Sequence, residues 1–386
     1  MILPEEIQVN IFLRLPVNSI LACRCVCKPL RVLLSKPEFI KSHLNRSIQK
    51  SNPRLMVDHF RHQEPSKNRT LHSIDYESMS SLSLTSTQQS VFDCGGAVVM
   101  NFPFEAEASL AWTKKREKAE TIVVDIWGSC NGLICLGIRL SPEMEEEEDI
   151  VCIWNPATKE YKKISLPICD GYYSIRYGFG YDNSIDNYQL VSVTDYEYAG
   201  SFEIKVYTLG SDSWSTIRTP VPYSFPVDIT HGLLFKGALH WLGTTTDQKS
   251  SAEVIVSFDV SSKRLLGLSF PERSLDYGVR EFWTKQFTCT QLSLTRRLLC
   301  KPIWCLESGE ILIQTDQDLV LYDQRNNTTR NVRICDDTMG SNLVTYVESI
   351  DSLKSGTYVE MPRSRRTKMK GAARSRKTMT RRATRH

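Results

Sequence analysis

The chain has 386 residues, of which 41% are hydrophobic and 24% are charged, and these fractions are ordinary for soluble globular proteins. No apolar run approaches the 18 or more residues of a membrane span, so we expect no transmembrane helix. No basic segment followed by an apolar stretch opens the sequence, so we expect no signal peptide. Twelve cysteines are scattered without a C-x-x-C pair, which favours reduced thiols. These features predict a protein of the cytoplasm, the nucleus or both.

The net charge of +4 combines two opposed parts of the chain. Residues 363–385 hold eleven Lys and Arg and no acidic residue, which leaves 37 basic and 44 acidic residues, a net charge of −7, elsewhere. We expect a disordered basic tail over residues 353–386, either as a solvated extension or as a nuclear-import signal. The tail has no aromatic residue on which bases could stack, so binding to nucleic acid is disfavoured.

The first 44 residues predict three short helices, followed by a last turn or two from Glu38 to Leu44. Pro4 suits the start of the first helix, because its missing N–H would be unpaired there in any case. Ile7 and Ile11 lie on one side of this helix, while Val9 and Leu13 lie on another. One apolar side can form the segment's own small core. The second side predicts a partner chain.

From about Pro53 onward the sequence changes to short β-type runs separated by turn residues. Four units share an apolar strand that ends in an aromatic residue, then a polar turn and a second strand, and a further hairpin precedes each unit. The four marker aromatics are Trp154, Tyr207, Phe258 and Tyr322. Two hairpins make a four-stranded blade, and a period near fifty residues is typical of a β-propeller. A β-sandwich is the alternative.

Little in the sequence resembles a catalytic or metal site. Gly128 to Gly132 has the G-x-C-x-G form of a nucleophile elbow, but a strand follows it where that motif needs a helix. Asn131-Gly132 is instead the strongest hairpin signal in the chain. Cys23, Cys25 and Cys27 alternate, so a helix would place only two of them on one face, and buried thiols are favoured over zinc. We therefore predict no catalytic residue, no cofactor and no metal.

Two stretches carry a family resemblance. Residues 3–44 resemble a plant F-box, whose pattern recurs in order as Leu3-Pro4, Arg14-Leu15-Pro16-Val17, Arg24-Cys25-Val26-Cys27-Lys28, Pro37-Glu38-Phe39 and His43-Leu44. The later segments GSCNGLICL, IWNPATKEYKKISLP, YGFGYD, GALHWL, VSFDV, GEILIQ, LVLYD and YVES resemble the kelch-like F-box-associated interaction domain of the same family. Within it, the chain is most similar to the group that includes regulators of plant defence receptors.

The resemblance implies the non-catalytic substrate receptor of a Skp-cullin-F-box ubiquitin ligase. The F-box would bind a Skp-family adaptor, the β domain would capture an unidentified protein substrate, and the cullin and RING subunits would join indirectly. The alternative is an F-box-like interaction module that does not support ubiquitin transfer. The adaptor contacts that the resemblance implies are Leu3, Pro4, Ile7, Leu15, Pro16, Val26, Cys27, Leu30 and Leu34.

The chain departs from the family pattern in two places. Pro29-Leu30 stands where relatives have Ser-Trp, which removes a large aromatic from the expected adaptor interface. About thirty residues, most of a blade, are missing before Tyr277. The ring would then close with a defective blade or be unstable, unless the gene model lost a coding segment. We expect an F-box at 1–46, a linker with possible first-blade strands at 47–94, and a propeller-like domain with one truncated blade at 95–352.

Overall fold

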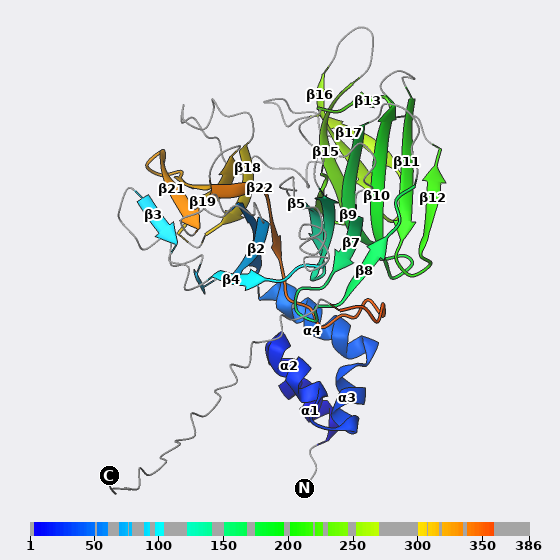
Figure 1. The fold of residues 1–386 in the computed structure, drawn as a ribbon, viewed down its shortest axis with the longest axis vertical. Coiled ribbons are helices and arrows are strands. Elements are labelled where there is room, and N and C mark those ends of the chain that lie inside the picture. Colours follow the sequence, from blue (N-terminus) through cyan, green and yellow to red (C-terminus); the bar gives the residue numbers. More distant parts are fainter. Residues whose placement is uncertain are drawn as a thin grey trace, which may run out of the picture.

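The structure is a computed structural model. It describes residues 4–50, 52–60, 69–75, 77–78, 89–92, 97–103, 122–140, 150–167, 174–196, 201–218, 221–226, 231–245, 252–269, 300–306, 308–315, 319–334 and 338–358. Helices precede the β domain and lie below it in Figure 1. They are α1 (Glu5–Phe12), α2 (Val17–Arg24), α3 (Lys28–Leu34) and α4 (Pro37–Gln49). The fourth, 13 residues long, replaces the turn or two expected at this place.

The strands form five sheets, which are the blades of a five-bladed propeller. Blade 1 contains β22 (Thr338–Tyr346), β1 (Arg54–Phe60), β2 (Arg69–Ile74) and β4 (Ala97–Met100). Blade 2 contains β5 (Ile122–Cys130), β6 (Leu133–Leu140), β7 (Ile150–Trp154) and β8 (Tyr161–Ile164). Blade 3 contains β9 (Ser174–Asp182), β10 (Asn187–Tyr196), β11 (Ser201–Thr208) and β12 (Ser213–Ile217).

The last two blades carry five strands each. Blade 4 contains β13 (Tyr223–Ser224), β14 (Leu233–Phe235), β15 (Ala238–Thr245), β16 (Glu253–Asp259) and β17 (Leu265–Ser269). Blade 5 contains β18 (Cys300–Cys305), β19 (Ile311–Thr315), β20 (Leu319–Asp323), β21 (Thr328–Ile334) and β3 (Gln89–Phe92), which pairs in parallel with β21. The predicted propeller is thus confirmed over the sandwich, and the four predicted two-hairpin units are blades 2 to 5.

Blade 1 joins the two ends of the β domain. Its strand β22 pairs antiparallel with β1, so that Arg54 lies opposite Tyr346. A ring of sheets needs such a closure, because each small sheet has two faces to cover. The closing blade therefore draws one strand from the C-terminal part of the chain and the others from the N-terminal part.

The turn after each marker aromatic has the same backbone in blades 2 to 5. The fifth residue beyond the aromatic has a positive φ in every case: Lys159 (62°), Asp212 (51°), Lys263 (60°) and Asn327 (51°). In two blades the aromatic itself supports this conformation, because the hydroxyl groups of Tyr207 and Tyr322 donate hydrogen bonds to Asp212 and Asn327. Asn131 and Gly132, with φ of 52° and 87°, form the expected type I′ turn.

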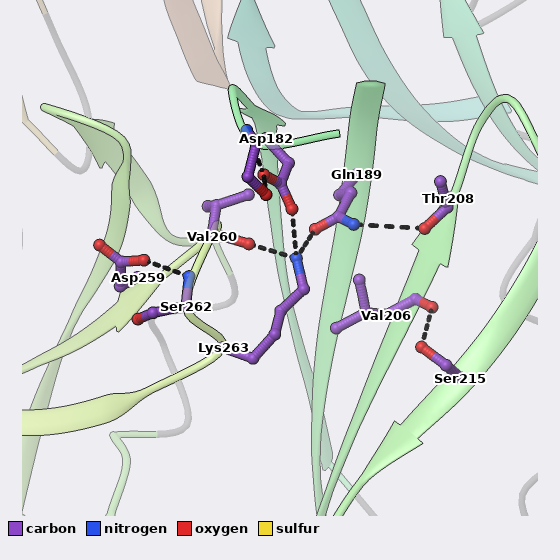
Figure 2. Close-up of polar contacts among 10 residues, drawn as sticks. Asp182, Gln189, Val206, Thr208, Ser215, Asp259, Val260, Ser262 and Lys263 are labelled. Atoms are coloured by element: carbon purple, nitrogen blue, oxygen red, sulfur yellow. Dashed lines mark hydrogen bonds and ion pairs between the residues drawn. The ribbon is translucent and has the colours of Figure 1, made fainter. Parts of the chain in front are cut away.

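Lys263 connects two neighbouring blades through its turn (Figure 2). Its Nζ donates to the Asp182 carboxylate of blade 3 at 2.8 Å, and also to Gln189 Oε1 and the Val260 carbonyl oxygen. Burial by itself would raise the pKa of the Asp182 carboxyl, but hydrogen bonds from Lys263 and Ser184 outweigh burial and hold the pKa at about 2. This contact fixes blade 3 to blade 4 near the helices.

Four apolar cores lie between successive pairs of blades: 5 and 1, 1 and 2, 2 and 3, and 3 and 4. Blade 4 differs from its neighbours because only its face toward blade 3 is buried. Its other face exposes Leu233, Phe235, Leu242 and Leu266. Within the described ranges, no apolar core joins blade 4 to blade 5. Residues 270–299, where the sequence predicted a truncated blade, lie outside the described residues.

The C-terminal boundary differs from the prediction. A disordered tail was expected from residue 353, but the chain keeps ordered contacts up to Tyr358, which forms a β-bridge with Glu160. Residues 359–386 lie outside the described ranges. None of the helices in the described parts of the chain is long and apolar enough to cross a membrane.

Candidate adaptor-binding surface

The four helices surround a small core that the β domain completes. Val17, Ile20, Leu34 and Phe39 are buried in it, together with Ile350 from the segment that follows β22. None of these helices has a side-chain cap at its N-terminus. Isolated helices of 7 to 13 residues are marginal in water, so this core must provide most of their stability. One apolar side of the helices is thus covered by the protein itself.

Polar contacts fix the same side of the helices to the propeller. Arg24 donates through Nε and Nη2 to the Leu34 carbonyl oxygen and through Nη1 to that of Ile350. Lys41 pairs with Asp186, in the turn between β9 and β10, at 2.6 Å. A cleft of about 1800 Å³ opens between the helices and blades 2 and 3 beside these contacts. The helices are therefore mounted on one rim of the propeller.

His43 holds the turn between α1 and α2. The residue is buried, and its Nε2 lies 2.9 Å from the Leu15 carbonyl oxygen, so this nitrogen carries the proton that is donated. Burial lowers the pKa of His43, and the hydrogen bond to Leu15 offsets this only in part, since the nearby Lys50 and Arg24 act in the same direction as burial. A neutral imidazole at pH 7 fits this position.

Several apolar side chains of the helical segment are not covered by the β domain. Ile7 and Ile11 of α1 are 48% and 46% exposed, Val26 between α2 and α3 is 72% exposed, and Val32 of α3 is 66% exposed. A groove of about 530 Å³ runs between α1 and α3, and it is lined by Glu5, Gln8, Lys28, Pro29, Leu30, Val32, Leu33 and Lys36. We call these exposed residues and this groove the open helical face. Several large apolar side chains exposed together mark an interaction surface.

Most of the predicted adaptor contacts lie where a second chain can reach them. Pro4, Ile7, Pro16, Val26 and Cys27 are exposed, and Leu15 and Leu30 are partly exposed. Leu3 lies outside the described residues.

Leu34 does not fit the predicted role of a direct adaptor contact, because its side chain is fully buried in the helical core. Its carbonyl oxygen also accepts the Arg24 hydrogen bonds. Its side chain packs in the core beneath the exposed residues of the helices.

The prediction missed Ile11 and Val32. The spacing of Ile7 and Ile11, four residues apart on one helix, could have found the first, because such residues share a face. Val32 had no such signal. In a helix of seven residues, the side that faces inward depends on how the helix packs, and periodicity cannot reveal it.

In the described part of the chain, no three His, Cys, Asp or Glu residues gather as metal ligands would. Cys23 is partly buried, whereas Cys25 and Cys27 are exposed, so the buried thiols expected at this place are not found for those two.

Comparison with known proteins agrees with this architecture. A family model described as the F-box domain matches residues 1–42, and one described as the F-box associated beta propeller domain matches residues 97–281. Neither describes an enzyme.

Individual relatives come from Arabidopsis thaliana. The F-box protein CPR1 is 23% identical, over 86% of this chain and 85% of that protein. The F-box/kelch-repeat protein At3g23880 is 26% identical over 70% of this chain but 65%, just under two thirds, of that protein. Among solved structures, TolB from Acinetobacter baumannii reaches a TM-score of only 0.31 at 8% identity, over 77% of this chain and 59% of that one, too weak a likeness to bear on the fold. On its two matched domains and their order, this chain belongs to the F-box proteins that carry an F-box-associated β-propeller domain.

Proposed function

We propose that this protein is the substrate-recognition subunit of a Skp-cullin-F-box ubiquitin ligase, with the open helical face as its adaptor-binding surface. The observation that carries the proposal is the two-sidedness of the helices. Their inner side is completed by Ile350, while Ile7, Ile11, Val26 and Val32 stay exposed. An adaptor that covers them would remove apolar surface from water, which favours association.

The propeller would capture the substrate at the rim away from the helices. The turn after β9 contacts Lys41, so β10 runs away from the helices and ends at the far rim. There Tyr196 pairs with Ser201, and the β15–β16 hairpin ends at the same rim. Residues 195, 196, 201, 244 and 245 lie at this rim, and residues 197–200 and 246–251 lie outside the described ranges.

The catalytic subunits of such a ligase would be other chains. The cullin and RING proteins would join through the adaptor, and this chain would contribute proximity, because holding a substrate lysine near the activated ubiquitin raises its effective concentration. The proposed location is the cytoplasm, the nucleus or both. Membership in the group of defence-receptor regulators stays a prediction.

Binding of a purified Skp adaptor to the full chain tests the proposal. Val26→Asp places a charge at the most exposed of the apolar residues of the open helical face, at a site that is too exposed to affect folding strongly. We expect it to weaken binding by about thirtyfold, the effect of a residue worth about 2 kcal/mol at an interface centre. Val98→Asp is the matched control, because Val98 is 53% exposed on the propeller. Equal binding by both variants would refute the assigned surface.

The alternative, an interaction module without ubiquitin transfer, is favoured by Leu30. This residue lines the groove of the open helical face where relatives have Trp. Leu30→Trp should tighten adaptor binding if the groove is the adaptor site. If neither the wild-type chain nor Leu30→Trp binds any Skp adaptor, the interaction module is the better assignment.

A further inference from the structure

A segment near the C-terminus passes between the helices and the propeller. We call residues 349–357 the strap. Its first residues are deeply buried, with Ser349 and Ile350 at 0% and 1% exposure, and its last ones pair with the edge of blade 2, where the Tyr161 N–H donates to the Thr357 carbonyl oxygen at 3.0 Å. Figure 1 shows this stretch, in red-orange, running below blades 2 and 3 beside α4.

Three successive carbonyl groups of the strap are held from opposite sides. Asn155 Nδ2 donates to the carbonyl oxygens of Ser349 (3.1 Å) and Asp351 (2.8 Å). The carbonyl between them, that of Ile350, accepts from Arg24 Nη1 at 3.3 Å. The Ile350 side chain meanwhile fills the helical core. One propeller residue therefore holds the carbonyl groups of both neighbours of Ile350, the residue on which the helices pack.

Asn155 does this while it closes its own turn. Its Oδ1 accepts from the N–H groups of Ala157 (2.9 Å) and Thr158 (3.2 Å). At the equivalent position, just after the marker aromatic, blades 4 and 5 have Asp259 and Asp323, whose Oδ1 atoms accept turn N–H groups in the same way. An aspartate thus suffices for the turn. Only the amide of asparagine can also donate to the strap.

The rest of the strap is anchored by carboxylate acceptors. Glu160 is 2% exposed, and its carboxylate accepts from Ser352 Oγ at 2.7 Å, from the Leu353 N–H at 3.0 Å and from the Ser355 N–H at 2.8 Å. Asp351 accepts from the Tyr188 hydroxyl of blade 3 at 3.0 Å. Hydrogen bonds to a charged acceptor are stronger than neutral ones, so the strap belongs to the propeller as a rigid part.

We propose that Asn155 is a positioning residue, which through the strap fixes the orientation of the helices, and with them the open helical face, relative to the propeller. The effect on ubiquitin transfer rests on the proposed function, whereas the rigid mounting itself does not. A fixed mounting holds a substrate bound at the far rim at one distance and angle from the adaptor. Misplacement by about 1 Å is enough to slow a transfer reaction substantially.

The variant Asn155→Asp isolates this role in the full-length chain. It keeps the turn acceptor, loses the two donors and sets a carboxylate against two carbonyl oxygens. The control Asp323→Asn makes the reverse exchange in blade 5, where Oδ1 accepts from Arg325 and Asn326. Two readouts report the mounting: hydrogen exchange of residues 349–357 and α2, and the yield of a carbodiimide cross-link between Lys41 and Asp186.

We expect Asn155→Asp to raise the exchange rates about tenfold and to lower the cross-link yield about fivefold. Exchange of β5 to β7 should stay unchanged, and adaptor affinity should stay within about twofold of wild type. Asp323→Asn should behave as wild type. With a bound substrate, ubiquitin transfer should slow although adaptor binding is retained.

Unchanged exchange and cross-linking in a folded Asn155→Asp chain would overturn the proposal. A parallel loss of adaptor affinity would also overturn it, because the helices would then be unfolding. If β5 to β7 lose protection, Arg24→Lys serves as the second variant, because it weakens the contact between the helices and the strap from the helical side. A wild-type cross-link yield in Arg24→Lys would then refute the inference. Loss of the cross-link in Asn155→Asp, together with no adaptor binding by the wild type, would sink the proposed function and leave the positioning role intact.

Discussion

Ile350→Ala tests whether the propeller completes the helical core. The side chain is 1% exposed and packs among Val17, Ile20, Leu34 and Phe39. Truncating a buried isoleucine to alanine removes the transfer energy of the lost carbons and leaves a cavity, at a cost of about 2–5 kcal/mol. We expect about 2–3 kcal/mol, because short helices at a domain junction can partly close the gap.

The sequence provides separate probes for the two parts of the molecule. All seven tryptophans lie at residue 112 or beyond, so tryptophan fluorescence reports only the β domain, whereas circular dichroism at 222 nm reports chiefly the helices. In a urea titration, the two signals of the wild type should coincide. In Ile350→Ala, the helical signal should fall first. A loss of about 2 kcal/mol with a slope of about 1 kcal/mol per molar urea corresponds to a midpoint shift of about 2 M.

The matched control is Ile185→Ala. Ile185 is 53% exposed in the turn between β9 and β10, so its truncation should change stability by less than about 0.5 kcal/mol. If Ile350→Ala keeps coincident transitions and a wild-type midpoint, the helices stand on their own. Packing of Ile350 would then make no measurable contribution to the free energy of unfolding.

Two further predictions concern charge and thiol chemistry. The folded pKa of Asp182, about 2, lies below the usual unfolded value of about 3.9, so its stabilising contribution is present above about pH 4 and is lost as the pH falls from about 4 to about 2. Lys263→Met should therefore lower the melting temperature at pH 7 and flatten the pH dependence of stability in this window; an unchanged slope would contradict the pairing. Burial raises the pKa of the Cys130 thiol to about 12 and raises those of Cys135 and Cys152 as well, whereas Cys27 and Cys305 are exposed. Iodoacetamide at pH 8 should thus label Cys27 and Cys305 at least about a hundredfold faster than Cys135, as measured by peptide mass spectrometry, and bound adaptor should protect Cys27 but not Cys305; equal protection of both would place the adaptor elsewhere.

The hairpins were predictable because their signals are local. Asn131-Gly132 specifies a turn that needs two positive φ values, and each marker aromatic stands five residues before the position with positive φ. The resemblance to a known motif located Ile7, Val26 and Leu30 of the open helical face. Leu34 was included among the predicted adaptor contacts because a motif shows which residues recur. A motif does not show whether a residue is exposed to a partner or buried beneath the residues that are.

The pairings between distant segments were beyond prediction. Ile350 enters the helical core from more than 300 residues away from Arg24, and β3 joins blade 5 through a parallel pairing with β21. Neither the segment around Ile350 nor β3 carries a local sequence signal that identifies the segment with which it packs. Residues 353–357 of the strap were predicted to belong to a disordered tail, yet the backbone N–H groups of Leu353 and Ser355 donate to Glu160.

The shared blade 1 has a consequence for synthesis on the ribosome. Strand β1 finds its neighbour β2 early, but its other edge stays open until β22 emerges, since Val57 pairs with Leu343. At about 5–20 residues per second, that delay amounts to tens of seconds. During this time an unpaired strand edge invites association with other nascent chains. Dependence on chaperones during translation should therefore be greater for this protein than for one whose sheets form in chain order.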